Sequence, residues 1–222
     1  MVKRKQFAVI GLGRFGGSVC RELYNLGHDV LGIDQDMERV EEFVQYSTHA
    51  LQGSGTDEAF LKSIGIRNFD HVIVSIGENI QDSVLTTLNL KELGVPIVWA
   101  KAQNGYHQKV LEKIGADQVI HPEVDMGIRI AQSMSSERLL DYINLSDEYS
   151  IVELRASKKL DYRTLADLDV RARYGITVLA IKREHEKMNV APLPKDVIHE
   201  GDVLVAMGKN EDLKRFEDKV LD

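Results

Sequence analysis

Cysteine is nearly absent from this 222-residue chain, which contains only Cys20. A single cysteine excludes an intrachain disulfide framework and favours a cytoplasmic location. Cys20 falls inside the first predicted helix, where we expect a small buried apolar side chain. The chain is long enough to build one good core and a second small domain.

Long apolar runs are also missing. The first apolar run follows the basic residues 3–5 and is interrupted by Arg14, so we expect neither a signal peptide nor a membrane anchor. Nothing approaches the roughly 20 apolar residues that span a bilayer. Any membrane association is therefore expected to come through a partner. The net charge of −7 argues against nucleic acid as a ligand.

Short β-branched runs alternate with segments of helical periodicity over the first part of the chain. The expected strands are 7–11, 29–34, 49–53, 71–77, 97–101 and 118–121, and the clearest helices are 37–46, 57–65, 83–94 and 106–115. This alternation predicts an α/β fold, a Rossmann-like doubly wound parallel sheet with right-handed crossovers.

The remainder of the chain has a different pattern. Residues 124–143 are expected to form a long helix whose apolar side chains occupy more than one face, which favours burial against another domain or subunit. Strand-like runs at 149–156, 176–183 and 202–208, a helical piece at 165–174, a hairpin tip at 184–187 and a final helix predict a small α+β domain. We therefore expect a nucleotide-binding domain at 1–123, a connecting helix at 124–144 and an α+β domain at 145–222.

The stretch FAVIGLGRFGGS carries a glycine loop between a predicted strand and a predicted helix. In such a loop Gly11 allows the tight turn, Gly13 lets the backbone approach phosphate, and Gly16 lets the helix pack closely on the strand. Asp34 ends the second predicted strand, where its carboxylate accepts hydrogen bonds from a ribose and disfavours a 2′-phosphate. Together these residues indicate a nucleotide site.

Polar residues also follow the other predicted strands, at the edge of the sheet where ligands bind. The candidate nucleotide-binding residues are Gly11, Gly13, Arg14, Phe15, Gly16, Asp34, Ser54, Gly55, Thr56, Gly77, Glu78 and Lys101. Arg14 and Lys101 exceed what a diester pyrophosphate usually requires and favour a triphosphate, although a solvated Arg14 is the alternative. Ser54 and Thr56 would serve equally well as helix caps.

Glu123 lies near the predicted anionic ligand, which repels a carboxylate unless a cation lies between them. A divalent ion, Mg²⁺ or Ca²⁺, would reconcile these charges. Capping of the helix that follows is the alternative function of Glu123.

The glycine loop, IVWAKAQN, GADQVIHPEVDMG and RARYGITVLAIKR together resemble the cytoplasmic regulatory subunits of Ktr potassium uptake systems, which belong to the TrkA-like domains that regulate conductance of potassium. The resemblance covers nearly the whole chain. It implies a non-enzymatic subunit whose homodimers assemble into an octameric ring on the inner face of a membrane potassium-translocating subunit. ATP would activate and ADP would inactivate by favouring different ring shapes.

Individual residues take roles from the same resemblance. Arg14 matches a sensor of the γ-phosphate of ATP bound in the neighbouring protomer, Asp34 matches the ribose-binding acid, and Glu123 matches a ligand of an activating cation. The α+β domain resembles an inhibitory cyclic di-AMP receptor module. Arg171, Ile176 and Pro192 match positions around that ligand, although Pro194 is an addition, and packing at a dimer interface is the alternative.

Other functions are weighed against this one. A dehydrogenase needs a general acid or base and a substrate domain, and the seven histidines offer no recognisable constellation. A kinase or ATPase would need a GxxxxGK[ST] loop, which the sequence lacks. A redox sensor that binds NAD(H) uses the same glycine loop and stays open.

Overall fold

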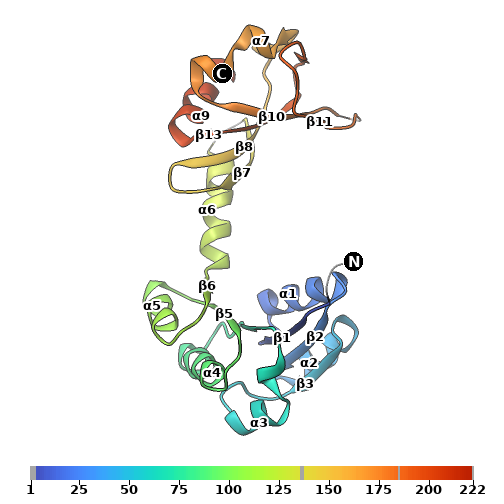
Figure 1. The fold of residues 1–222 in the computed structure, drawn as a ribbon, viewed down its shortest axis with the longest axis vertical. Helices are drawn as coiled ribbons and strands as arrows, with labels where there is room; N and C mark the ends of the chain where they lie inside the picture. The colour runs from blue at the N-terminus through green and yellow to red at the C-terminus, as the bar shows by residue number, and fades with distance from the viewer. Residues whose placement is uncertain (1–3, 136–137, 185, 222) are drawn as a thin grey trace. The chain divides into compact units, whose positions relative to one another are not determined.

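A parallel sheet of six strands forms the first part of the chain (Figure 1). The computed structural model describes residues 4–135, 138–184 and 186–221. The chain divides into two compact units, Met1–Glu123 and Val124–Asp222. The strands of the first unit are β1 Gln6–Ile10, β2 Asp29–Asp34, β3 His49–Gln52, β4 His71–Val74, β5 Ile97–Lys101 and β6 Gln118–Ile120. Its helices are α1 Arg14–Asn25, α2 Met37–Phe43, η1 Val44–Tyr46, α3 Glu58–Ser63, η2 Ile66–Asn68, α4 Ile80–Glu92 and α5 Gly105–Lys113.

The strand order β3-β2-β1-β4-β5-β6, with every pair parallel, confirms the predicted doubly wound sheet. The chain direction across the sheet reverses between β1 and β4, which is where ligands bind in such folds. Alternate residues of β1 enter two cores, because strand side chains point to opposite faces. Ala8 and Ile10 pack with Leu90, whereas Phe7 and Val9 pack with Cys20. Cys20 is fully buried, as predicted, and burial raises the pKa of its thiol to about 11.

The helix predicted over 124–143 is wrong in its second half. Helix α6 spans Pro122–Met134, and β7 follows at Leu139–Asn144. β7 pairs antiparallel with β8, Tyr149–Arg155, so that Tyr142 lies opposite Val152. Hydrogen bonding of residues 139–144 to β8 therefore overrides the helical pattern of their sequence.

The second unit is built on an antiparallel sheet of order β11-β10-β13-β8-β7. Its remaining strands are β9 Arg163–Thr164, β10 Thr177–Lys182, β11 Asn189–Val190, β12 Val197–Ile198 and β13 Val203–Lys209. Its helices are η3 Lys158–Leu160, α7 Leu165–Leu168, α8 Val170–Tyr174, α9 Asn210–Phe216 and η4 Glu217–Leu221. The predicted hairpin is confirmed by the antiparallel pairing of β10 and β11, although one residue of its tip, 185, lies outside the described residues.

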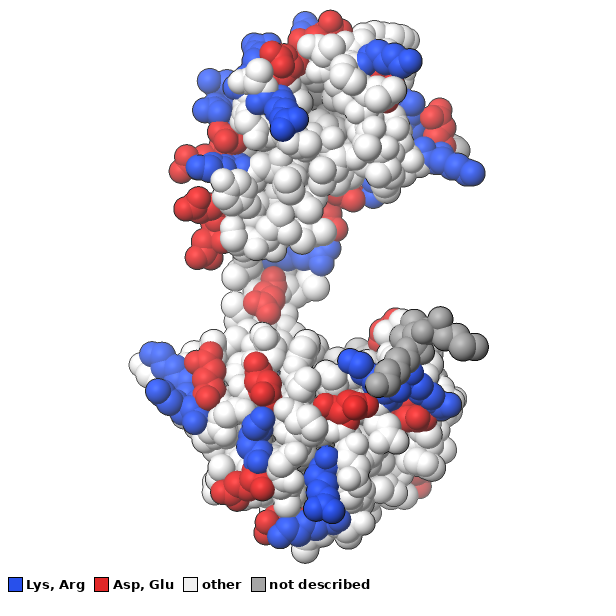
Figure 2. Space-filling view, viewed as in Figure 1, with Lys and Arg blue, Asp and Glu red and all other residues white. Residues whose placement is uncertain are grey.

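The core of this unit lies between the sheet and the last helices. Phe216 is fully buried there, and its ring meets the Tyr174 ring edge to face at 5.4 Å between centroids. Figure 2 shows acidic and basic side chains mixed over the visible face of each unit. Within the described part of the chain, every helix is too short or too polar to cross a bilayer.

Candidate nucleotide-binding site

The glycine loop joins β1 to α1 and has the tight geometry that its sequence predicts. Gly11 has a φ of +98°, and its amide donates to the Ile33 carbonyl at 2.8 Å. A Cβ on Gly16 would lie 1.9 Å from the Gly11 carbonyl oxygen, so helix α1 meets the loop where only glycine fits. Gly13 is the N-cap of α1 and provides no side-chain cap. The first amides of this helix are therefore available to an anion.

Asp34 holds the loop from the end of β2. Its carboxylate accepts hydrogen bonds from the Leu12 amide at 2.6 Å and from the Asp36 amide at 2.9 Å, and the residue is only 8% exposed. The side chain thus fixes the loop and places a negative charge at the carboxyl end of β2, the strand end where this kind of fold binds a ribose. Arg39 lies beside it, with Nη1 3.6 Å from the Asp34 carboxylate.

Of the two predicted phosphate cations, Lys101 contacts Glu123 directly, and the charge of Arg14 also acts on the Glu123 carboxyl. The Lys101 ammonium forms an ion pair with the Glu123 carboxylate, and it lies 6.0 Å from the centre of the Phe15 ring. The hydrogen bond from Lys101 and the positive charges of Lys101 and Arg14 lower the pKa of Glu123. Arg14 is exposed at the start of α1. The structure therefore brings Phe15, Lys101 and Glu123 together at one edge of the sheet, and Arg14 precedes Phe15 at the start of α1.

Glu123 does not cap α6, because that helix begins at Pro122. The cation that balances its charge in the described part of the chain is Lys101. Among the described residues, no group of three His, Cys, Asp or Glu side chains is arranged to hold a metal ion. A cation at Glu123 would therefore need ligands from the nucleotide, water or another subunit.

The loop after β3 is held by its own hydroxyl groups. Ser54 and Thr56 lie 2.7 Å apart through their side-chain oxygens, and Ser54 also accepts from the Gln35 side chain at 3.0 Å. Neither caps the following helix; Asp57 does so by accepting from the Phe60 amide. A Cβ on Gly55 would lie 2.5 Å from Thr86, so this loop packs directly on α4.

The loop after β4 contains Gly77 and Glu78, and β4 pairs with β1 on the side opposite β2. Asn79 caps α4 by accepting from the Asp82 amide at 3.1 Å. The Gln103 side chain donates to the Gly77 carbonyl, which ties this loop to the one after β5. Glu78 is exposed. Sequence reasoning missed Gln103 as a support of the site, although it lies only two residues beyond Lys101.

The second unit places the three predicted cyclic di-AMP residues in different surroundings. Arg171 is exposed on α8, and Pro192 is partly exposed in the loop between β11 and β12. Ile176 is fully buried and joins the core of this unit, which favours a packing role over ligand contact.

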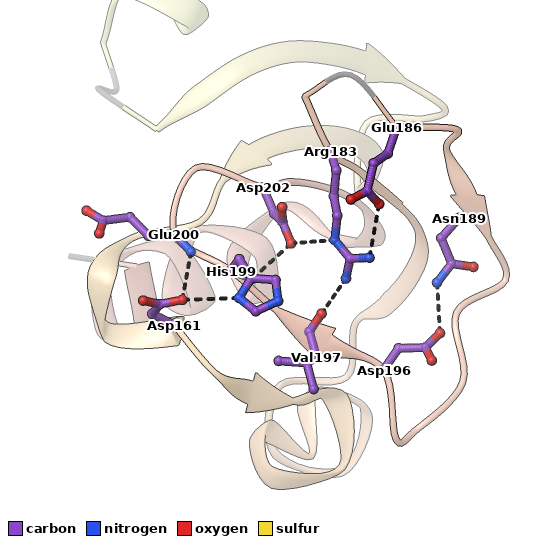
Figure 3. Close-up of polar contacts among 9 residues, drawn as sticks. All are labelled: Asp161, Arg183, Glu186, Asn189, Asp196, Val197, His199, Glu200 and Asp202. Carbon is purple, nitrogen blue, oxygen red and sulfur yellow. Dashed lines mark hydrogen bonds and ion pairs between the residues drawn. The ribbon is translucent and has the colours of Figure 1, made fainter.

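A polar network holds the loop that carries Pro192 (Figure 3). The Asp196 carboxylate accepts from the Leu193 amide and the Asn189 side chain, both at 2.8 Å. Arg183 donates to the Val197 carbonyl at 2.6 Å and to Asp202 at 3.3 Å. The backbone around Pro192 is therefore fixed from both ends.

Comparison with known proteins identifies the family. The TrkA-N domain matches residues 7–122, and the TrkA-C domain matches residues 149–221. The chain is 60% identical over 98% of both chains to Ktr system potassium uptake protein A of Bacillus subtilis. The chain belongs to the Ktr family of potassium uptake proteins. Ktr system potassium uptake protein C of Bacillus subtilis is 55% identical, again over 98% of each chain.

Membership of the Ktr family identifies the chain as a regulatory subunit rather than an enzyme, as the sequence predicted. Among solved structures, the GsuK channel has a TM-score of 0.70 at 18% identity and supports the fold of this Ktr chain. The alignment covers 99% of this chain, which spans only 40% of that channel.

Arg39 is a second residue near the site that the sequence analysis did not single out. It lies five residues beyond Asp34 in the Ktr chain, and a signal was available. A cation in the first turn of a helix opposes the helix dipole and is uncommon there. A residue that local helix energetics disfavour is expected to have a functional role.

Proposed function

We propose that this Ktr subunit is a nucleotide-gated regulator of a membrane potassium-translocating subunit. ATP favours the active arrangement of the regulator and ADP the inactive one. The observation that carries the proposal is the grouping of Arg14 and Lys101 with Glu123 beside the glycine loop. The 60% identity to a Ktr system potassium uptake protein supports the choice of partner. In this proposal the subunit is cytoplasmic and forms homodimers that assemble into an octameric ring.

The charges at the loop support the distinction between ATP and ADP. The amides of α1 and one cation suffice for a pyrophosphate. Lys101 is already balanced by Glu123, whereas Arg14 is exposed, which supports its contact with an additional phosphate in its own or a neighbouring protomer. A ligand changes an equilibrium between shapes only when it binds them differently. In this proposal Arg14 supplies that difference through the γ-phosphate.

Replacement of Arg14 by alanine is expected to weaken ATP binding about 10- to 100-fold, because a hydrogen bond to a charged group contributes about 1.5–3 kcal/mol. ADP binding should change by less than about threefold, since α1 and Asp34 remain. Calorimetric titration of each nucleotide measures both values. Arg21→Ala removes the same charge from the same helix and should leave both affinities intact. An unchanged ratio of ATP to ADP affinity in Arg14→Ala would contradict the proposed sensor.

For the cation we propose a site at Glu123, filled by Mg²⁺ or Ca²⁺ when nucleotide is bound. The Glu123→Gln variant should lose most of the thermal stabilisation that the divalent ion adds to the ATP-bound protein, because a neutral amide is a poor ligand for a hard cation. A melting series with and without the ion provides the measurement. Asp125→Asn makes the same change of charge on the same helix and serves as the control. Equal cation effects in Glu123→Gln and the unmodified protein would rule out this role.

Two further ligands are tested by the same titrations. Cyclic di-AMP is proposed as an inhibitory ligand of the second unit, near Arg171 and Pro192. NAD(H) is the alternative ligand of the glycine loop, where Asp34 would bind a ribose in the same way. Tight binding of ATP and ADP without turnover supports the gated regulator. Binding of NADH with no binding of ATP or ADP would contradict the nucleotide-gated regulator and favour a redox sensor.

A further inference from the structure

Arg39 stands where local helix energetics disfavour it. It occupies the first turn of α2, whose N-cap Asp36 accepts from the Glu38 amide at 3.0 Å. The positive end of the helix dipole repels a cation at this position. Two carboxylates offset that cost, because Arg39 lies 3.6 Å from Asp34 through Nη1 and 3.6 Å from Asp36 through Nε. Both distances are too long for hydrogen bonds, so these ion pairs leave the guanidinium donors available.

The guanidinium also lies over the glycine loop. Its Nη1 is 3.7 Å from the point where a Cβ on Gly13 would stand, and the Arg39 side chain is 47% exposed. Gly13 begins the helix that receives the phosphates, and Asp34 marks the ribose position. Arg39 therefore lies on the Asp34 side of the glycine loop, where a ribose is expected. The positive charges of Lys101 and Arg14 act instead on Glu123.

We propose that Arg39 is a specificity-determining residue of the nucleotide site, which binds the adenosine ribose together with Asp34 and sets the discrimination at the 2′ position. The proposal rests on nucleotide binding at the glycine loop, as argued above. The relevant ligands are adenine nucleotides with a free or a phosphorylated 2′-hydroxyl.

Charge determines the direction of the effect. Asp34 alone would repel a 2′-phosphate strongly, as acidic residues do at this position of dinucleotide folds. A guanidinium 3.6 Å away offsets that charge, and its planar fork of donors suits phosphate oxygens. With Arg39 present, the site should reject a 2′-phosphate only weakly. Without it, rejection should be strong.

The test compares 5′-AMP with adenosine 2′,5′-bisphosphate, two probes that differ only at the 2′ position. Both are titrated calorimetrically into the full chain, with ATP and ADP in parallel. In Arg39→Ala we expect ATP and ADP affinities to fall together by about three- to tenfold. We also expect the preference for 5′-AMP over the bisphosphate to rise by about tenfold. Arg39→Lys keeps the charge and should restore part of the 2′ effect, and Arg67→Ala is the control at an exposed arginine on η2.

The outcomes separate the two proposals. A rise in 2′ discrimination together with an unchanged ratio of ATP to ADP affinity supports the role of Arg39. An Arg39→Ala protein with unaltered 2′ discrimination overturns it, even if its melting temperature falls, because a purely structural ion pair would act that way. If the unmodified protein binds none of the four probes, the proposed nucleotide function fails instead. Should Arg39→Ala not fold, Arg39→Gln provides the same readout with the side-chain volume retained.

Discussion

Substitution of Gly16 by alanine is expected to abolish nucleotide binding and to lower the free energy of unfolding of the first unit by on the order of 3 kcal/mol. The added Cβ would lie 1.9 Å from the Gly11 carbonyl oxygen and 2.8 Å from the Ser75 Cβ. Neither neighbour is the flexible end of a side chain, so α1 must move away from β1. That movement displaces the amides that would receive the phosphates. Chemical denaturation and ATP titration measure the two effects.

The control for this prediction is Gly105→Ala. Gly105 also lies at the start of a helix in the first unit, but an added Cβ there meets nothing within 4 Å. This variant should bind nucleotide normally and unfold at the usual denaturant concentration or higher. Comparable losses in both variants would show that the effect does not depend on the close approach at Gly16.

The Phe216→Ala variant is expected to destabilise the second unit by about 3–5 kcal/mol, the usual cost of removing a buried aromatic ring. Phe216 has no exposed surface, and its ring packs on Tyr174 at 5.4 Å between centroids. The chain divides after Glu123, so the first unit contains the whole glycine-loop site. Calorimetric unfolding should show the second unit melting at a lower temperature than in the unmodified protein. Nucleotide should still raise the melting temperature of the first unit.

Phe216→Leu provides the graded control, because it retains part of the buried volume and should cost less than half as much. Loss of ATP binding in Phe216→Ala at a temperature where the first unit remains folded would contradict the independence of the two units. A single cooperative unfolding transition whose melting temperature nucleotide no longer changes would also contradict this independence.

The sheet of the first unit could be predicted because its sequence signals agree with one another. Each β-branched run ends in a loop and leads into a helical pattern, and this alternation predicts a parallel sheet with right-handed crossovers. The region around 139–144 could not be predicted in the same way. Its apolar residues fit a helix as well as a strand, and only pairing with β8 decides between them.

The site shows the same division between local and distant information. Lys101 and Glu123 lie at or just after the ends of neighbouring parallel strands, so the sequence correctly predicts that they lie at the same edge of the sheet. The sequence could not show that they would neutralise one another, since that depends on side-chain geometry across two strands. The burial of Ile176 could not be predicted from its motif either. It results from the close fit of Ile176 against Gly208 in the folded unit.

The Lys101–Glu123 ion pair has a thermodynamic consequence for any ligands of this edge. An anion that draws the lysine away leaves the carboxylate without its counter-charge, and the carboxylate then attracts a cation more strongly. Because linkage is reciprocal, a cation on Glu123 releases the lysine for the anion by the same free energy. One exchangeable ion pair is thus sufficient to make anion and cation cooperative ligands, with no change in the backbone.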